Sequence, residues 1–256
     1  MSYIAKGSII AGALAVGSSF VAAPVSAETT LKFANWLPPV HHWTSTARKF
    51  SDSIEDASGG KIKVKMDKGA LAKPPGQFDL AVNGVRDMVM HVAAYTPGRF
   101  VFYRMAEIPF ATKNAATGSE GFHKWYVENG FDKKEFKGAK LLSGFVHGPG
   151  MLHSKKEIKS LSDIKGVKIR VGGGGVLIAK SLGAVPVAMS ATKAHESLQR
   201  GTTDAAFFPY EAVHGFKLAK LVKYHHNDSI FWIWLVREHG AGGGGYCSSR
   251  RGRSLY

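Results

Sequence analysis

The feature that most constrains the fold is a pattern of strand, helix, strand, helix and strand that occurs twice. The first copy is expected to have strands at 31–36, 61–66 and 87–91 and helices at 43–54 and 77–83. The second is expected to have strands at 167–171, 185–189 and 204–208 and helices at 176–182 and 191–200. Strands that alternate with helices indicate parallel strands joined by right-handed crossovers. The sequence therefore predicts two α/β lobes of the same architecture rather than a solenoid.

The two copies share a local signature at the same place. Gly84 is followed at a spacing of three by Asp87, and Gly201 in the same way by Asp204. Each pair stands between the end of an expected helix and the start of the next strand, where glycine is the usual helix stop. Two lobes of this kind commonly bind a small molecule in the cleft between them.

These patterns give expected domain boundaries. We assign 28–145 together with 210–236 to lobe I and 146–209 to lobe II, because 141–145 and 224–235 have the character of strands that cross between lobes. A short helix is expected at 216–221. The last stretch, 237–256, is rich in Gly, Arg and Ser, has no apolar periodicity, and is predicted to be a disordered, atypical tail.

The N-terminus is predicted to be a signal peptide. Lys6 ends a short basic region, 7–23 is small and apolar, and small residues precede a cleavage point that would make Glu28 the first mature residue. The run is too rich in Gly, Ala and Ser for a membrane anchor. Cys247 is the only cysteine, so no intramolecular disulfide is expected in the exported chain.

Composition excludes several classes of function. The formal net charge is +15, but Lys and Arg are scattered among Asp and Glu without the basic and aromatic clusters of a nucleic-acid module. No Gly-x-Ser-x-Gly motif occurs, and no catalytic pair is recognisable. His41 and His42 are adjacent without a carboxylate at ligand spacing, so no metal is expected. We expect neither an enzyme nor a cofactor.

Arg170 is the leading candidate for ligand binding. It is the last charged residue of the strand expected at 167–171, just before the four glycines 172–175. Ligands of α/β sheets bind at the carboxyl ends of strands, and a guanidinium binds a carboxylate through two parallel hydrogen bonds. The alternative is an exposed arginine paired with a neighbouring acid. The glycines lack the Gly-Lys-Ser/Thr sequence of a phosphate loop and are expected to let the backbone approach the site of Arg170.

The chain resembles the solute receptors of TRAP transporters (tripartite ATP-independent periplasmic transporters). The resemblance rests on motifs in the same order, at 33–41, 84–88, 95–100, 108–110, 163–170, 182–187, 198–204 and 224–226. It implies a periplasmic receptor, expected to be monomeric, with the type II-like two-lobed architecture of periplasmic binding proteins. It also implies that Arg170 forms a salt bridge with the carboxylate of an organic acid. The loaded receptor would then deliver its ligand to a membrane permease driven by an ion gradient.

Three departures from the family pattern refine this expectation. The segment 146–151 lacks the second arginine that some members carry, and Phe208 stands where some members have asparagine. Both changes favour a monocarboxylate with an apolar or aromatic body. The third departure is the tail, which we interpret as a truncation or a frame shift near Arg237.

Five further residues are candidate ligand contacts. Trp36 ends the first strand and His41 follows in the next loop, with core packing as the alternative for Trp36. Tyr95 follows the third strand, His147 lies where the second arginine is missing, and Phe208 lies beside the second Gly-x-x-Asp turn.

Two other functions remain open at this point. One is an exported sensor that reports its ligand to a membrane kinase. The other is an exported α/β enzyme that uses His147 or His91 as general base.

Overall fold

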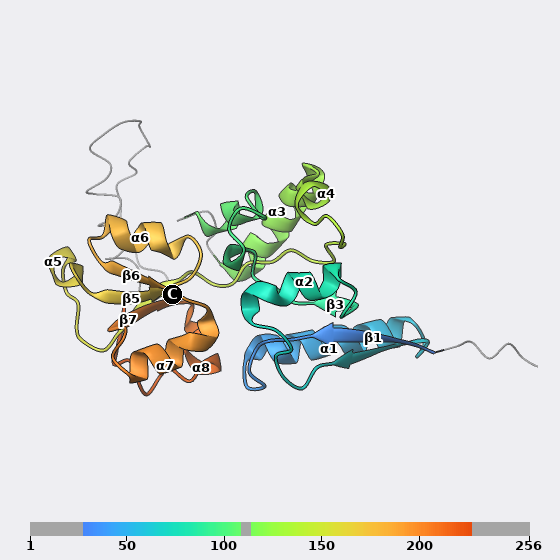
Figure 1. Ribbon diagram of the computed structural model, residues 1–256, viewed down its shortest axis with the longest axis horizontal. Coiled ribbons are helices and arrows are strands. Elements are labelled where there is room, and N and C mark those ends of the chain that lie inside the picture. Colours follow the sequence, from blue (N-terminus) through green and yellow to red (C-terminus); the bar gives the residue numbers. More distant parts are fainter. Residues whose placement is uncertain (1–27, 109–113, 227–256) are drawn as a thin grey trace, which may run out of the picture.

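The computed structural model describes residues 28–108 and 114–226, and these form two α/β lobes side by side (Figure 1). The predicted signal peptide at 1–27 and the predicted tail at 237–256 lie outside the described residues. No helix in the described part of the chain is both long enough and apolar enough to cross a membrane.

The sheet of the first lobe has three parallel strands in the order β2-β1-β3. The strands are β1 (Thr29–Ala34), β2 (Ile62–Met66) and β3 (Met88–Val89). The 16-residue helix α1 (His42–Ala57) connects β1 to β2, and α2 (Gln77–Val82) connects β2 to β3. Helix α1 is followed closely by Gly59 and Gly60, whose positive φ angles suit glycine and prevent the helix from continuing.

The rest of the first lobe packs around an aromatic cluster. It contains α3 (Ala115–Glu128) and α4 (Phe131–Glu135), preceded by 3-10 turns at Ala93–Tyr95 and Tyr103–Glu107. Buried rings of Phe78, Phe100, Tyr126 and Phe136 form the cluster. The buried Glu135 carboxylate accepts hydrogen bonds from the backbone N–H groups of residues 102 and 103 and from the Tyr126 hydroxyl. This network connects the turn at Tyr103–Glu107 to the helices.

The sheet of the second lobe has five strands in the order β6-β5-β7-β4-β8. The strands are β4 (Met151–Ser154), β5 (Lys168–Val171), β6 (Val185–Ala188), β7 (Ala205–Phe208) and β8 (Tyr224–His226). Strands β5, β6 and β7 are parallel, whereas β4 runs antiparallel to its neighbours β7 and β8. The helices are α5 (Leu161–Ile164), α6 (Gly175–Ser181), α7 (Ala194–Gln199) and α8 (Tyr210–Gly215). Helices α5 and α6 lie on one side of the sheet and α7 and α8 on the other (Figure 1).

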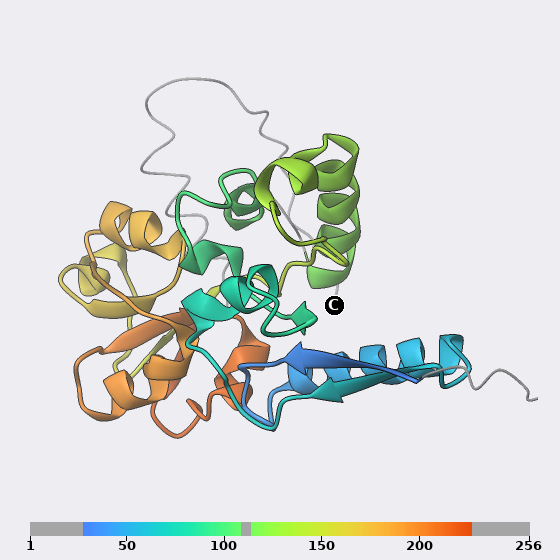
Figure 2. The same ribbon diagram turned by 45° about the vertical axis from the view of Figure 1, so that its right-hand side comes forward.

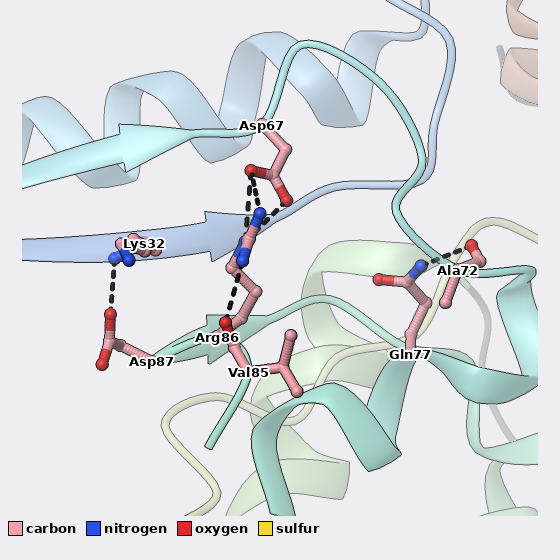
Figure 3. A network of polar contacts seen from close by, with 7 residues as sticks. All are labelled: Lys32, Asp67, Ala72, Gln77, Val85, Arg86 and Asp87. Atoms are coloured by element: carbon pink, nitrogen blue, oxygen red, sulfur yellow. Dashed lines mark hydrogen bonds and ion pairs between the residues drawn. The ribbon is translucent and has the colours of Figure 1, made fainter. Parts of the chain in front are cut away.

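The predicted repetition of the two lobes is confirmed. The parallel strands β2-β1-β3 match β6-β5-β7 in order and direction. The Asp87 carboxylate accepts a hydrogen bond from the backbone N–H of Lys32 at 2.7 Å, and Asp204 accepts one from Lys168 at 3.3 Å (Figure 3 shows the first). In each lobe, this aspartate connects the start of the third strand to the first strand.

A second contact reinforces the first lobe beside Asp87. Nε–H of Arg86 donates a bifurcated hydrogen bond to both oxygens of the Asp67 carboxylate, directly after β2, and Nη2 donates another to Oδ1 (Figure 3). The pair therefore bridges the two outer strands of this sheet.

The assignment of 210–236 to lobe I is corrected for its described part. Strand β8 pairs with β4 in the second sheet, and the apolar residues of α8 and the following turn pack with α7 and β7. The predicted helix at 216–221 is also wrong, because helix α8 precedes it and Lys217 adopts a left-handed φ of 57° that ends the helical path. Residues 227–236 lie outside the described part.

The strand expected at 141–145 is not formed. The backbone N–H of Gly144 donates to Nδ1 of His123 at 2.9 Å, and that of Phe145 donates to the Tyr103 hydroxyl at 3.2 Å. Side chains therefore accept hydrogen bonds from the backbone N–H groups that would otherwise pair with a neighbouring strand. From here the chain enters the second lobe as an irregular segment, which Figure 2 shows between the lobes.

Candidate functional site

A cavity of about 370 Å³ lies between the two lobes. Its volume falls in the usual range for small-ligand sites. The first lobe contributes Pro75, Ala94, Tyr95, Pro97 and Arg104. The second lobe contributes residues from the ends of β5 and β6 and from the glycine loop, including Val171, Gly172, Gly173, Met189 and Ser190. The lining is mostly apolar. Among the described residues that form it, Arg104 is the one with a charged side chain.

Arg170 lies directly behind this lining, on β5. The strand alternates, so that Ile169 and Val171 point into the core of the second lobe and Arg170 points to the other face. The residue is 3% exposed. A Cβ added to Gly172 would lie 3.2 Å from Nη2 of Arg170, so glycine there allows the guanidinium to approach the wall of the cavity.

The guanidinium of Arg170 is held mainly by neutral groups. Nη2 donates to the carbonyl of Met189 at 2.8 Å and to the Tyr95 hydroxyl at 3.4 Å, and Nη1 donates to the carbonyl of Phe207 at 3.3 Å. Its carbon lies 4.2 Å from the ring centroid of Phe208, a cation–π contact. Nε is buried without a hydrogen-bond partner within the described ranges.

No carboxylate of the described residues is hydrogen-bonded to Arg170. Burial lowers the pKa of this side chain, and the Tyr95 hydroxyl raises it in part. An arginine nevertheless stays protonated in a protein. The site therefore holds a buried positive charge, which favours an anion close by.

Tyr95 is the predicted site residue that lines the cavity. It comes from the 3-10 turn Ala93–Tyr95 of the first lobe, and its hydroxyl also accepts the backbone N–H of Ala191 at 2.9 Å. Tyr95 thus connects the two lobes at the cavity.

The structure places Trp36 and Phe208 near Arg170 but outside the cavity lining. The ring centroids of Trp36 and Tyr95 are 6.3 Å apart, and those of Trp36 and Phe216 are 6.4 Å apart. Trp36 and Phe208 are buried, at 6% and 5% exposure, in one cluster formed by both lobes. For Trp36 the structure favours the alternative of core packing.

His41 and His147 do not line this cavity. His41 is the N-cap of α1, where its Nδ1 accepts the backbone N–H of Trp43 at 3.2 Å. Burial lowers the pKa of His41 to about 4, and neighbouring His42 lowers it further while Glu211 raises it. His147 is exposed, and its Nδ1 lies 2.6 Å from the carbonyl of Gly148. The contacts of His41 are those of a structural residue.

His91, named as a possible base, lies in the aromatic cluster of the first lobe, with ring centroids 4.9 to 5.6 Å from those of Phe78, Phe100 and Phe136. Burial lowers its pKa to about 4, and Arg99 lowers it further. Within 28–108 and 114–226, no group of three or more His, Cys, Asp or Glu side chains is arranged to hold a metal ion.

The glycine loop contacts a carboxylate of the protein itself. The backbone N–H of Gly174 donates to Oε2 of Glu107 at 3.1 Å, and Nε of Arg104 donates to the same oxygen at 3.2 Å. A Cβ on Gly173, whose φ is +51°, would overlap with Oε1 of Glu107. Arg104 and Glu107 escaped the sequence analysis because they lie in a segment without periodicity, and only a pair of opposite charges at i and i+3 marks them.

The profile of the family described as bacterial extracellular solute-binding protein, family 7, matches residues 33–236. The chain is 25% identical over 222 residues to the 2,3-diketo-L-gulonate-binding periplasmic protein of Escherichia coli. That alignment covers 84% of this chain and 65% of the E. coli protein. This chain therefore spans slightly less than two thirds of its relative.

Solved structures show the same architecture. A TRAP periplasmic solute-binding protein from Bordetella bronchiseptica, with bound mandelate, is 32% identical at a TM-score of 0.73, over 77% of this chain and 64% of that one. One from Rhodoferax ferrireducens, with copurified benzoate, is 33% identical at a TM-score of 0.72, over 77% and 62%. A marine metagenome protein bound to 3-hydroxybenzoate is 32% identical at a TM-score of 0.72, over 78% and 63%. All three are two-lobed receptors, so the predicted fold class is confirmed.

Proposed function

Because this chain belongs to family 7 of the bacterial extracellular solute-binding proteins, we propose that it is the periplasmic receptor of a TRAP transporter and binds a monocarboxylate with an aromatic or apolar body. The ligand occupies the cavity between the lobes, and the receptor delivers it to a membrane permease. The observation that carries the proposal is an apolar cavity of about 370 Å³ with a buried arginine behind its wall. Apolar walls bind the body of such an acid, and the guanidinium binds its carboxylate.

Arg170 is the proposed carboxylate anchor. Two of its present hydrogen bonds, to the Tyr95 hydroxyl at 3.4 Å and to the carbonyl of Phe207 at 3.3 Å, are longer than optimal. A carboxylate at the same place would form shorter, charge-assisted bonds. Tyr95 and Phe208 complete this site, because one contacts the guanidinium edge and the other lies against its face.

The ligand class is supported by three relatives above 30% identity, which were solved with mandelate, benzoate and 3-hydroxybenzoate. Each of these ligands is a monocarboxylate with an aromatic ring. The mostly apolar lining of the cavity agrees with such a ligand better than with a sugar acid, whose hydroxyl groups would need polar partners.

Calorimetric titration and thermal melting test this proposal together. We expect benzoate, 3-hydroxybenzoate and mandelate to bind and to raise the melting temperature, and succinate and galacturonate to have little effect. Binding of galacturonate alone would overturn the ligand class. Absence of binding by every carboxylate would overturn the receptor function.

The same samples separate the receptor from an enzyme. His91 and His147 lie away from the cavity lining, so the bound acid has no histidine base within the described residues of the site. We expect nuclear magnetic resonance spectra of the ligand to stay unchanged during incubation with the protein. Uptake of labelled benzoate by cells that contain the receptor and its permease would distinguish transport from sensing.

A further inference from the structure

Arg104 occupies a position in the cavity that the sequence analysis did not identify. It lies in the 3-10 turn Tyr103–Glu107, on the opposite lobe from Arg170. Its side chain lines the cavity and is 35% exposed. Tyr103 is hydrogen-bonded to the Glu135 carboxylate through its backbone N–H and to the backbone N–H of Phe145 through its hydroxyl, and these bonds hold the turn on the first lobe.

Only one edge of the Arg104 guanidinium is engaged. Nε donates to Oε2 of Glu107, and neither terminal nitrogen donates a hydrogen bond to any group in the part of the chain that the structure describes. Oε2 of Glu107 is fixed in turn by the backbone N–H of Gly174 in the second lobe. Glu107 therefore orients Arg104 and leaves its terminal nitrogens available as donors.

We propose that Arg104 is a ligand-binding residue of the first lobe, which contacts the carboxylate of the bound acid when the lobes are closed. This inference rests on the proposed function and adds a second cation to it. Arg170 binds the acid from the second lobe, and Arg104 completes the contact from the first.

The charges at the cavity indicate which acids fit. Arg104 and Arg170 contribute two positive charges, and Glu107 contributes one negative charge, so these three side chains carry a net charge of +1. A monocarboxylate neutralises this charge, whereas a dicarboxylate leaves an uncompensated negative charge in a partly buried place, which is unfavourable. Arg104 and Glu107 thus select a monoanion.

The position of Arg104 on the first lobe has a kinetic consequence. A ligand that first meets the second lobe contacts Arg170 before the lobes close and Arg104 only afterwards. Loss of Arg104 should therefore raise the dissociation rate and change the association rate little. A residue that only stabilised the first lobe would change the melting temperature of the free protein instead.

The test compares Arg104→Gln with Arg99→Gln. Arg99 belongs to the same lobe and has its own ion pair with Asp79 at 2.6 Å, but it does not line the cavity. For benzoate, calorimetry and stopped-flow fluorescence of the tryptophans should show roughly 10- to 100-fold weaker binding by Arg104→Gln, most of it in the dissociation rate. Arg99→Gln should bind within about twofold of the wild type.

A second variant tests the charge count. Glu107→Gln raises the net charge of the site to +2, so the affinity for phthalate, a dicarboxylate, should increase relative to benzoate by roughly fivefold or more. Wild-type benzoate affinity and dissociation rate in Arg104→Gln would overturn the role of Arg104 and leave the receptor function intact. Failure of the wild-type protein to bind any carboxylate would overturn both.

Discussion

The hydroxyl of Tyr95 lies 3.4 Å from Nη2 of Arg170, so the first lobe forms a hydrogen bond with the buried arginine of the second lobe through this oxygen atom. The same oxygen accepts the backbone N–H of Ala191 at 2.9 Å. Both donors belong to the second lobe, whereas Tyr95 belongs to the first. This oxygen therefore links closure of the lobes to the position of the arginine.

Replacement of Tyr95 by phenylalanine should weaken the closed state. It removes the acceptor of both donors, which costs about 1–3 kcal/mol when a buried donor loses its partner. We expect benzoate to bind about 5- to 100-fold more weakly by calorimetry, and small-angle scattering to show a more open protein. Tyr103→Phe is the matched control, because the Tyr103 hydroxyl is hydrogen-bonded to the backbone of Phe145 within the first lobe and not to Arg170. Equal losses of affinity in both variants would contradict the role of Tyr95.

Replacement of Arg170 by lysine tests the proposed anchor. An ammonium group keeps the charge but cannot reproduce the planar fork, the two carbonyl contacts and the stacking on Phe208. We expect affinity for benzoate to fall at least tenfold, measured by calorimetry. Lys168→Gln, two residues earlier on the same strand and exposed, should change it little. An unchanged affinity in Arg170→Lys would remove Arg170 from the site.

Replacement of Gly173 by alanine should prevent full closure. A methyl group there would overlap with Oε1 of Glu107 and lie 2.6 Å from Cβ of Ala94, both in the first lobe. Gly201→Ala is the matched control, because Gly201 also has a positive φ, of +73°, but a Cβ added there would have no atom within 4 Å. Backbone strain of about 1 kcal/mol should therefore appear as lower stability in both variants. Only Gly173→Ala should also lose affinity for benzoate, and equal affinities would show that this contact does not control closure.

Stability should fall on acidification, and His153 should contribute to the decline. This residue is fully buried, and burial is the main reason why its pKa is lowered to about 4. The hydrogen bond to the Phe208 carbonyl raises the pKa in part, and nearby His225 and His226 lower it. Nε2–H donates to the carbonyl at 3.0 Å, so in the neutral side chain Nδ1 is the acceptor and faces Nδ1 of His225 at 2.7 Å. The unfolded chain binds that proton with a pKa near 6.5.

The sign of this effect follows from the two pKa values. The folded value is lower, so protonation favours the unfolded chain. The contribution of His153 is intact above pH 6.5 and is lost as the pH falls towards 4, by roughly 2–3 kcal/mol in total. Urea unfolding at pH 7 and pH 4.5 should show a smaller decline in His153→Gln, which retains a donor for the carbonyl. The pKa values of His41 and His91 are also about 4, so part of the decline in stability should remain in that variant. Equal declines in both proteins would contradict this assignment.

Sequence periodicity predicted the repeated part of the fold well. Strands β1, β2, β5, β6 and β7 and their connecting helices lie within a few residues of their expected places, because alternation and terminal glycines marked both ends. Strand β3 is shorter than expected, since only Met88 and Val89 pair with the end of β1. Strand β4 was missed because it is fully buried and does not alternate.

The site was predictable only where it coincides with strand ends. Arg170 and Tyr95 could be selected because each follows or ends a periodic segment, and the structure brings them together. Arg104 and Glu107 could not, because their positions depend on the contact between Glu107 and Gly174, 67 residues away in the sequence. His147 was chosen because it lies where the second arginine is missing, just after the crossing strand expected at 141–145, and side-chain contacts replace that strand in the structure.

The aspartate contacts at Asp87 and Asp204 have a mechanical consequence. Each ties the strands of its own sheet, and no sheet in the described part of the chain includes strands from both lobes. At the cavity, the lobes are joined instead by a few side-chain hydrogen bonds, such as those of Tyr95 and Glu107. Under a stretching force the boundary between the lobes should yield first, while both sheets stay whole. Separation of the lobes would therefore leave intact the sheet that positions Arg170.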